Sequence, residues 1–583
     1  MIPVKWKFRS PSPPEQIAGL SESTNLHPII CQILVNRGIE KIEAINDFLN
    51  PDLKKIPDPF LLKDMSKAVE RIEYALKKGE KILIYGDYDV DGITASAVLS
   101  EYLTDCGGKV RVRLPNRIKD GYGLSKKVID EAHREGVTLL ITVDCGSSDH
   151  EAAEYAHKIG IDMLITDHHH TPDTLPKSLA IINPKQEECP YPYKHLAGVG
   201  VALKLVQALS LYGQGKQMRL DQIGFWPNML NRYLDLVCLG TIADIMPLTG
   251  ENRIFVKYGL NALNRTERPG LIALKNIAGI ADKDMTTGLV GFALAPRINA
   301  TGRVSGPEEG LRLLLTKSPE EGECLAKFLD QQNQKRREIE GKILREVYKK
   351  IKKELRIADE MIIILSDKGW HPGVIGIVAQ KLVEEFYRPA VIISVQSGLG
   401  KGSARSIPNI HLYQLLYQCQ ELLRDFGGHA AAAGLTIEEK MIPLFREKAN
   451  QILNETCNKE DLVSEITIDA MMDSISLDDH FVAQLDSLAP FGSENPEPSL
   501  CLKGVCLTCQ PRLLKDAHLK IHLKYGSVIH EGIGFNMRRI WEYMLSFPPS
   551  HMWDVVFYPQ FNHWRGENHI QLRLKDVKAH APH

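Results

Sequence analysis

The stretch that decides the fold is KILIYGDYDVDG, residues 81–92. Its first half, Ile82 to Tyr85, is an apolar run typical of a buried strand, and the carboxylates that follow it are Asp87, Asp89 and Asp91. Because residues two apart in an extended chain point the same way, these carboxylates share one face. Like charges at this spacing raise one another's pKa unless a cation lies among them. The stretch therefore favours a metal site over the alternative, an acidic solvated turn.

Outward from this stretch, apolar strands alternate with helices. The apolar runs predict strands over 81–85, 109–115, 138–143, 162–166 and 180–184. The amphipathic segments between them predict helices over 93–104, 125–136 and 150–160. This βαβ alternation is typical of a doubly wound α/β fold with a parallel sheet. Ligands in such sheets bind outside the carboxyl ends of the strands.

Further potential metal ligands lie at the carboxyl ends of two other predicted strands. Strand 138–143 leads to Asp144 in VDCG, and strand 162–166 leads to TDHHH, which contains Asp167, His168, His169 and His170. Asp244 lies in the otherwise apolar GTIADIMPL, where an ionised carboxylate is costly to bury unless it is paired. Each residue alone could be a helix cap, a polar loop residue or a salt-bridged acid. Together they converge on one edge of the predicted sheet.

The composition of this ligand set predicts which metal it binds. Carboxylate oxygens with imidazole nitrogen and no thiolate favour Mn²⁺ or Mg²⁺ over structural zinc. Five or six such ligands suit two ions, and two ions about 4 Å apart stabilise the attacking and leaving oxygens of phosphoryl transfer. Cys506 and Cys509 form a CxxC pair without a second pair at zinc-ribbon spacing, so we do not expect zinc there.

Candidate phosphate-binding residues lie in other segments, whose small residues suggest loops rather than helices. They are Arg117 in LPNRIKDGYG, Arg297, Asn299 and Arg303 in APRINATGR, Lys401, Ser403 and Arg405 in GKGSARSIP, and His429 in FGGHAAAAG. Glycine lets a ligand approach the backbone closely, and exposed backbone N–H groups bind phosphate. The alternative for each arginine is an ordinary surface charge.

A chain of 583 residues is too long for a single core. We predict an N-terminal extension over 1–60, whose Pro- and Ser-rich start lies loosely over a neighbouring domain. An α/β domain over 61–325, a connecting helix over 326–356, a smaller α/β domain over 357–460 and an OB-like β-barrel over 461–583 complete the chain. From residue 335 to 356 the helix has ten Lys or Arg against four Glu. Such a helix is either a solvated connector or a nucleic-acid contact.

The bulk composition limits the class of protein. The net charge of −2 gives no hint of a polyanionic partner, so any such affinity must come from local patches. Eleven scattered cysteines suit a reducing compartment, and we expect the cytoplasm. We see no apolar run near 18 residues and no signal-peptide core, so we expect neither a membrane span nor secretion.

The motifs also carry a family resemblance. DYDVDG, VDCG, TDHHH and GTIADIMPL resemble the four ordered motifs of the DHH phosphoesterase superfamily. LAGVGVALK, APRINATGR, WHPGVIGIVAQKL, GKGSARSIP, FGGHAAAAG and APFGSENPEP resemble the RecJ single-strand-specific exonucleases in particular, from about residue 60 to the C-terminus. The resemblance implies a DHH domain over 61–325, a DHHA1 domain over 357–460 and an OB fold over 461–583. It also implies 5′→3′ removal of nucleotides from single-stranded DNA with Mn²⁺ or Mg²⁺, in repair and recombination.

The resemblance extends to individual residues. It implies metal ligands at Asp89, Asp91, Asp144, His168 and Asp244. It implies a catalytic role for Asp87, Asp167 and His169, and contacts to substrate phosphate for Arg117, Arg303, Ser403, Arg405 and His429. The departures, Ser-Glu in FGSENPEP and the residue after glycine in VDCGSS, remove no ligand. Implied partners are single-stranded DNA, a DNA helicase and a single-strand-binding protein, with the chain itself a monomer.

Two other functions remain open. One is a small-substrate DHH phosphodiesterase that cleaves cyclic dinucleotides, short oligonucleotides or pyrophosphate. The predicted C-terminal barrel argues against it, because a small substrate needs no domain that tracks a strand. The other is a non-enzymatic DHH scaffold of a replication complex, and the intact acidic set argues against that.

Overall fold

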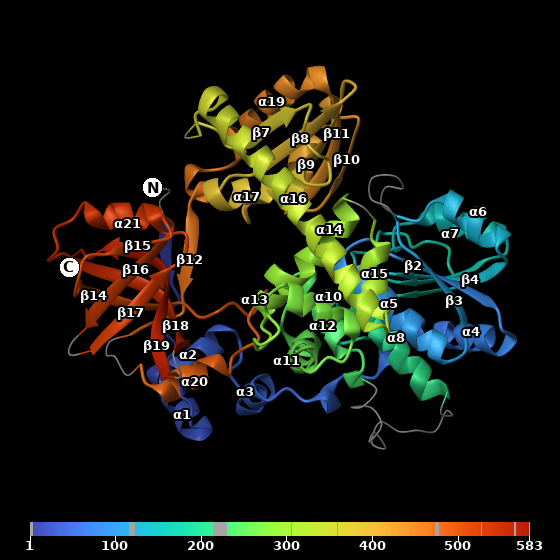
Figure 1. The fold of residues 1–583 in the computed structure, drawn as a ribbon, viewed down its shortest axis with the longest axis horizontal. Helices are drawn as coiled ribbons and strands as arrows, with labels where there is room; N and C mark the ends of the chain where they lie inside the picture. Colours follow the sequence, from blue (N-terminus) through green and yellow to red (C-terminus); the bar gives the residue numbers. More distant parts are fainter. Residues whose placement is uncertain are drawn as a thin grey trace. The chain divides into compact units, whose positions relative to one another are not determined.

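The computed structural model describes residues 4–115, 123–213, 230–304, 306–357, 359–472, 477–525, 528–564 and 567–581. The chain forms two compact units, which Figure 1 shows as a ribbon. Unit 1 combines Met1–Asp52, Val463–Phe491 and Pro496–His583. Unit 2 combines Leu53–Leu462 with Gly492–Asn495. Among the described residues, the helices are too short or too polar to cross a bilayer.

The first domain of unit 2 contains the predicted parallel sheet. Its strands are β2 (Lys81–Gly86), β3 (Lys109–Arg113), β4 (Val137–Val143), β5 (Asp162–Thr166) and β6 (Ala180–Ile182). They pair in the order β3-β2-β4-β5-β6, and every pairing is parallel. The chain direction across the sheet therefore reverses between β2 and β4. This topological switch point is the place where open α/β sheets bind ligands.

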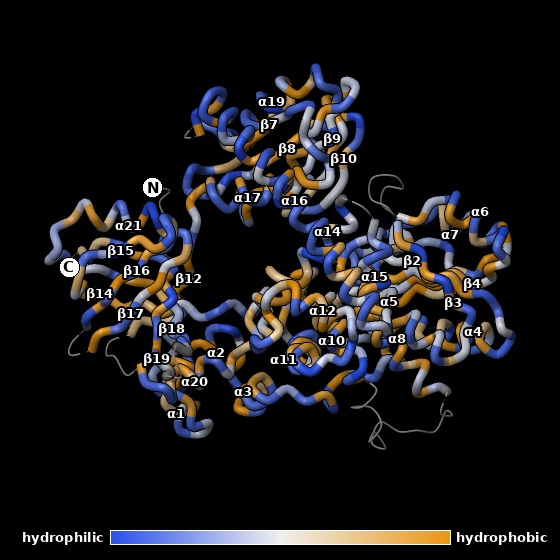
Figure 2. The backbone as a smooth tube through the Cα atoms, in the orientation of Figure 1, coloured by the Kyte–Doolittle hydropathy of each residue, from blue (hydrophilic) through white to orange (hydrophobic). Residues whose placement is uncertain are grey.

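Helices cover both faces of this sheet, so its inner strands β2, β4 and β5 are mostly apolar on both sides. Ile82 and Ile84 of β2 enter one core, whereas Leu83 and Tyr85 enter the other. Figure 2 shows the hydrophobic residues along β2 and β4. The larger core packs against α4 (Met65–Lys78), α5 (Val90–Asp105), α8 (Gly198–Gly213), α10 (Leu234–Ala243), α11 (Gly250–Asn264), α12 (Pro269–Ile277) and α15 (Glu308–Leu315). The smaller core packs against α6 (Lys126–Arg134) and α7 (His150–Lys158).

Between α12 and α15 a continuous helical run changes its pitch. It comprises α13 (Thr287–Leu289), the π-helix η4 (Val290–Leu294) and α14 (Ala295–Val304). The segment APRINATGR, whose small residues suggested a loop, therefore lies in a helix. The α-helical periodicity of Leu294, Ile298 and Thr301, all buried, explains why.

A single long helix, α16 (Pro319–Glu354), connects the two α/β domains of unit 2. It begins before the predicted residue 326, because Ser318 caps it and accepts a hydrogen bond from the N–H of Glu321. Leu329 belongs to the core of the first domain and Val347 to the core of the second. The apolar stripe of α16 is thus buried at both ends, as expected for a helix that connects two domains.

The second α/β domain of unit 2 has a mixed sheet. The strands are β7 (Ile363–Asp367), β8 (Ala390–Gln396), β9 (Leu399–Arg405), β10 (Asp425–Gly428) and β11 (Ala432–Glu438), in the order β10-β11-β9-β8-β7. Only β7 and β8 are parallel. The helices are α17 (Ile375–Phe386), α18 (Leu412–Gln418) and α19 (Ile442–Thr456). Strands β9, β10 and β11 were not predicted, because their Gly- and Ala-rich sequences lack the usual strand residues.

Unit 1 contains a closed β-barrel. Its strands are β14 (Leu500–Leu507), β16 (His518–Tyr525), β17 (Val528–Gly534), β18 (Met552–Trp564) and β19 (Glu567–Ala579). Strand β14 pairs with both β18 and β16, which closes the barrel. Helix α21 (Arg538–Leu545) separates β17 from β18. The five-stranded barrel agrees with the predicted OB-like domain.

The Pro- and Ser-rich start of the chain was predicted to lie loosely over a neighbouring domain, and this prediction is wrong. The N-terminal residues are packed within unit 1. Strand β1 (Val4–Phe8) pairs in parallel with β12 (Ser464–Ile468). Helices α1 (Pro14–Thr24), α2 (Pro28–Asn36) and α3 (Ile42–Leu49) share a hydrophobic core with the barrel and with α20 (Asp479–Asp486). The remaining short elements are η1 (Leu53–Lys55), η2 (Pro59–Leu61), η5 (Gln420–Leu422), η6 (Glu439–Met441), η7 (Lys459–Leu462), β13 (Ala470–Met471) and β15 (Arg512–Leu514).

Candidate metal centre

The acidic and histidine candidates meet at the topological switch point of the parallel sheet. Three groups of side chains have potential ligand atoms within 4.8 Å of one another. These groups are Asp144 with His168 and His169, Asp91 with His168 and Asp244, and Asp87 with Asp89 and Asp144. Because Asp144 and His168 each belong to two groups, the side chains form one centre. The convergence expected from the strand ends is therefore present.

The loop DYDVDG is shaped by the start of helix α5. Asp89 caps this helix, and its Oδ1 accepts hydrogen bonds from the N–H groups of Asp91 and Gly92 at 2.9 and 3.1 Å. A Cβ at Gly92 would lie 2.6 Å from the backbone of Asp87, so the loop folds tightly only with glycine there. One oxygen of Asp89 is thus used for capping, which leaves the other for a ligand.

Asp91 is held by the first turn of helix α8. The N–H groups of Gly198 and Val199 donate to its two carboxylate oxygens at 2.7 and 2.8 Å. The positive end of the α8 dipole therefore faces the acidic centre. Sequence reasoning described this segment only as an apolar helix and missed its anchoring role. The available signal was the GVG at the expected helix start.

Burial and mutual repulsion oppose ionisation of the clustered carboxylates. Burial, followed by the charge of Asp89, raises the pKa of Asp91 to about 7. Burial, followed by the charge of Asp91, raises the pKa of Asp244 to about 8 and that of Asp144 well above its usual value. Asp144 also adopts φ +61°, a conformation that non-glycine residues rarely take. Strain of this kind is often found at functional sites.

The donor set fits a divalent cation. Asp144 Oδ1 and His168 Nε2 are buried 3.1 Å apart, and neither has a hydrogen-bond partner among the described residues. Burial lowers the pKa of His168 to about 3, so its ring is neutral and can offer a lone pair. The Oδ2 of Asp244 lies 3.6 Å from the same nitrogen. Carboxylate oxygens with one neutral imidazole suit Mn²⁺ or Mg²⁺.

Asp167 acts on His169 instead of joining these groups. Its carboxylate accepts hydrogen bonds from the N–H of Ser147 at 2.9 Å and from the N–H of His168 at 2.7 Å. His169 Nδ1 lies 2.8 Å from the same carboxylate. Although burial favours the neutral forms, this contact holds the pKa of Asp167 well below its usual range and raises the pKa of His169 to about 9. The contact with Asp167 therefore favours the protonated form of His169.

Two of the predicted phosphate contacts have structural partners within the protein. Arg297 Nε pairs with Asp330 of α16 at 2.9 Å, and its Nη1 donates to the carbonyl of Ala293 at 2.7 Å. Asn299 Oδ1 accepts from the N–H of Val90 at 3.1 Å. These residues hold α14 against α16 and α5. Arg117 lies outside the described residues.

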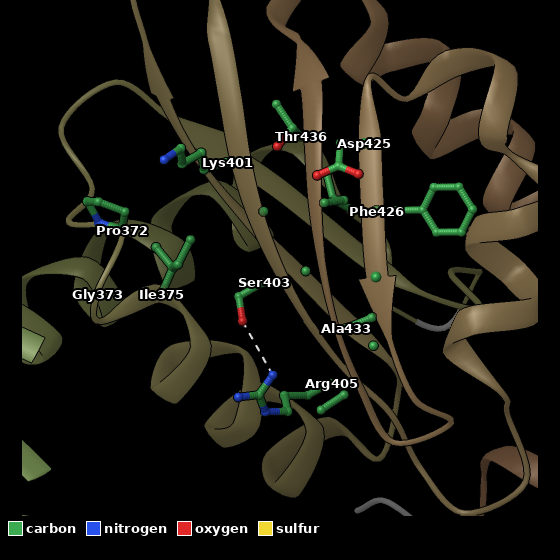
Figure 3. Close-up of a pocket in the computed structure, with 16 residues that line it drawn as sticks. Pro372, Gly373, Ile375, Lys401, Ser403, Arg405, Asp425, Phe426, Ala433 and Thr436 are labelled. Atoms are coloured by element: carbon green, nitrogen blue, oxygen red, sulfur yellow. Dashed lines mark hydrogen bonds between the residues drawn. The ribbon is translucent and has the colours of Figure 1, made fainter. Parts of the chain in front are cut away.

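Other predicted phosphate contacts lie where the two α/β domains of unit 2 meet. Arg303 donates to the carbonyl of Gly373 at 3.2 Å. Ser403 and Arg405 line a pocket of about 530 Å³ on strands β9 to β11, where Arg405 Nη1 donates to Ser403 Oγ at 3.3 Å (Figure 3). Lys401 lines the same pocket.

The predicted His429 belongs to the turn between β10 and β11. Its ring lies 6.3 Å from the ring of His170 in the TDHHH motif. The second α/β domain therefore reaches the histidine motif beside the metal centre.

Lys185 is a basic residue near the centre that sequence reasoning missed. It follows Asn183, which donates through Nδ2 to the carbonyl of His169 at 2.9 Å. Burial lowers the pKa of Lys185, and the charges of Asp244 and Asp167 oppose that shift. The available signal was its position at the carboxyl end of strand β6, in INPK.

Comparison with family models and with known proteins agrees with this architecture. Residues 81–241 match the DHH family, N-terminal domain; residues 357–455 match the DHHA1 domain; and residues 468–576 match the RecJ OB domain. The single-stranded-DNA-specific exonuclease RecJ of Bacillus subtilis is 35% identical over 98% of this chain and 71% of its own length. The protein of that name from Escherichia coli is 33% identical over 95% of this chain and 96% of its own length.

Solved structures show the same likeness. The crystal structure of RecJ in complex with Mn²⁺ from Thermus thermophilus has a TM-score of 0.83 and 29% identity. It covers 100% of this chain, which spans 80% of that structure. With the sequence identities and the three domain matches, this assigns the family. The chain belongs to the RecJ family of single-stranded-DNA-specific exonucleases within the DHH superfamily.

Proposed function

We propose that this chain is a metal-dependent exonuclease that degrades single-stranded DNA from its 5′ end to 5′-mononucleotides, in DNA repair and recombination. The observation that carries the proposal is the cluster of Asp91, Asp144, His168 and Asp244, the first three of them buried, in a chain of the RecJ family. Relatives bear the name single-stranded-DNA-specific exonuclease, and a related crystal structure contains Mn²⁺. Both support the metal and the substrate proposed here.

The ligands proposed for Mn²⁺ or Mg²⁺ are Asp89, Asp91, Asp144, His168 and Asp244, with Asp87 at the edge of the set. Two such ions, when bound, supply Lewis acidity to phosphate oxygens and lower the pKa of water. The protein prepares this site by burying Asp91 and Asp144 and by fixing Asp91 with the first turn of α8. The neutral imidazole of His168 adds a ligand without adding negative charge.

His169 and the basic residues contact the substrate in this proposal. The imidazolium of His169, held by Asp167, can donate a hydrogen bond to a phosphate oxygen at the reacting centre. Arg303, Ser403, Arg405 and His429 would hold the 5′ end, because guanidinium groups and hydroxyls bind phosphate well. An anchored 5′ end determines which phosphodiester bond lies at the centre, and so favours release of single nucleotides.

The rest of the chain supports a polymeric substrate. The barrel of unit 1 presents Lys520, His522 and Lys524 on the outer side of β16, because the intervening residues are buried in the barrel. OB-like barrels bind single strands through such surfaces. A helicase that opens duplex, a single-strand-binding protein, a monomeric state and a cytoplasmic location complete the proposal. The barrel disfavours a small-substrate phosphodiesterase, and the intact cluster disfavours an inactive scaffold.

The test is digestion of 5′-labelled and 3′-labelled DNA with Mn²⁺, as single strand and as blunt duplex. We expect early release of the 5′ label as mononucleotide from the single strand, late release of the 3′ label, and little release from the duplex. Cleavage of only dinucleotides would favour the small-substrate enzyme, and no cleavage would favour the scaffold.

A further inference from the structure

We propose that Ile245 and Phe292 form an apolar platform that contacts the nucleobases of the single strand beside the metal centre. The inference rests on the proposed function and adds base contacts to it. Phe292 is 83% exposed and Ile245 is 75% exposed, the highest values among the exposed large hydrophobic residues that the structure describes. Exposed apolar side chains that lie together near a candidate active site can form a binding surface.

Ile245 occupies a backbone position that normally belongs to glycine. Helix α10 ends in a Schellman motif, in which the N–H of Ile245 bonds to the carbonyl of Ile242 at 3.1 Å and the N–H of Met246 to that of Thr241 at 3.2 Å. Ile245 has φ +56°, which is strained for a β-branched residue. The side chain of Ile245 is mostly exposed, so burial does not offset the strain of this conformation. What isoleucine adds over glycine is an apolar surface immediately after Asp244.

Phe292 lies on the π-helix η4, a rare element that is frequent at functional sites. A Cβ at Gly291 would lie 3.9 Å from Ile242 Cγ2, so this π-helix packs on the last turn of α10. The same helical run continues to Asn299, which holds the N–H of Val90 between the two metal-ligand candidates Asp89 and Asp91. Both apolar side chains thus stand on elements that carry or anchor the metal centre.

A nucleobase is the occupant that fits this position. With Mn²⁺ or Mg²⁺ bound, the centre would attract the phosphate, so the bases would lie against the neighbouring surface. Aromatic and apolar side chains stack on bases regardless of sequence, because every base has a π-face. Bases inside a duplex are already stacked on each other and cannot reach such a platform. The platform would therefore add to selectivity for single strands.

Ile245→Gly separates this role from a structural one. Because glycine relieves the strained conformation, the variant should raise Tm while it weakens binding to single-stranded DNA by about 5-fold or more. Binding is measured with Mn²⁺ present, so that the centre can hold the phosphate. The probe is an oligonucleotide that carries 2-aminopurine near its 5′ end and non-hydrolysable internucleotide linkages, so that it binds without being cleaved. A variant with lower Tm, or with unchanged affinity, would overturn the role of Ile245.

Phe292→Ala tests the stacking contact with a matched substrate pair. On the 2-aminopurine oligonucleotide we expect the variant to bind about 10-fold more weakly and to quench the fluorescence less than the parent protein. On the same oligonucleotide with abasic nucleotides near the 5′ end, the variant and the parent protein should bind equally well. Phe292→Trp should retain binding. Tyr74→Ala removes an exposed aromatic of α4 and is the control. Equal loss of affinity on both oligonucleotides, or no loss, would overturn the proposal.

These experiments measure binding and not cleavage. A parent protein that binds in this way but hydrolyses no DNA would therefore contradict only the proposed function.

Discussion

Gly198 donates its backbone N–H to Asp91 Oδ2 at 2.7 Å, and it leaves no space for a side chain, because a Cβ there would lie 2.5 Å from Asp144 Oδ1. One residue therefore determines both how Asp91 is held and how closely α8 approaches the acidic centre. The substitution Gly198→Ala should displace either Asp144 or the start of α8. We expect at least a 100-fold loss of nuclease activity and weaker Mn²⁺ binding in calorimetry.

Gly200 provides the matched control for that substitution. It lies in the same helical turn, and a Cβ there would meet only the side chain of Leu196, at 3.4 Å. Gly200→Ala should therefore keep most activity and Mn²⁺ affinity. Similar losses in both variants would show that the effect comes from the helix and not from the metal centre.

Removing one charge from the cluster should stabilise the protein and inactivate it. Asp144 is buried among other carboxylates, and the pKa of its side chain is raised, so its ionised form opposes folding when no cation is bound. We expect Asp144→Asn to raise the Tm of the metal-free protein by a few degrees and to abolish hydrolysis of single-stranded DNA. Full activity in this variant would remove Asp144 from the ligand set.

The stability of the metal-free protein should fall as pH rises. Asp91 and Asp244 have folded-state pKa values of about 7 and about 8, above the usual value near 3.8. Groups whose pKa is raised by folding contribute stability below the unfolded pKa and lose it as pH rises through the folded pKa. In EDTA we therefore expect Tm to decrease from pH 6 to pH 8.5. The corresponding decrease in the free energy of unfolding is on the order of a few kcal/mol.

Saturating Mn²⁺ should oppose that decrease, because a cation favours the ionised carboxylates. The rise in Tm that Mn²⁺ causes should be larger at pH 8.5 than at pH 6. Differential scanning calorimetry at both pH values measures it. A Mn²⁺ effect that is the same at both pH values would contradict a site built from these raised carboxylates.

Arg297 and Arg405 should differ in what they contribute. Arg297 forms a mostly buried ion pair with Asp330, so Arg297→Ala should lower the free energy of unfolding by about 1–3 kcal/mol and leave KM for DNA nearly unchanged. Arg405→Ala should instead raise KM, and more for a 5′-phosphorylated strand than for a 5′-hydroxyl strand. Steady-state kinetics on the two substrates separates these effects, and a KM increase in Arg297→Ala would return that residue to the substrate site.

The sequence was most informative where strand geometry alone determines which residues lie together. Apolar runs ended at Asp87, Asp144 and Asp167, and parallel pairing brings such strand ends together, so the cluster could be predicted without coordinates. Strand geometry gives no information about which face of a helix meets a neighbour. It therefore could not show that Arg297 and Asn299, which we predict as phosphate contacts, also bond to Asp330 and to the N–H of Val90.

Other features depended on long-range pairing. Strand β9 has the sequence LGKGSAR, and its strand conformation comes from pairing with β8 and β11 on either side rather than from its own residues. The anchoring of Asp91 by α8 joins residues more than a hundred positions apart. The helices of residues 14–49 need the barrel of the C-terminal segment to bury their apolar faces. None of these contacts has a local signature.

The central claim is tested most directly by identifying the first product that the chain releases from a 5′-phosphorylated single strand in Mn²⁺, with Asp144→Asn and EDTA as references. We predict a 5′-mononucleotide from the 5′ end, released by the parent protein alone and only with the metal present. Release from the 3′ end, or hydrolysis that persists in EDTA or in Asp144→Asn, would contradict the account.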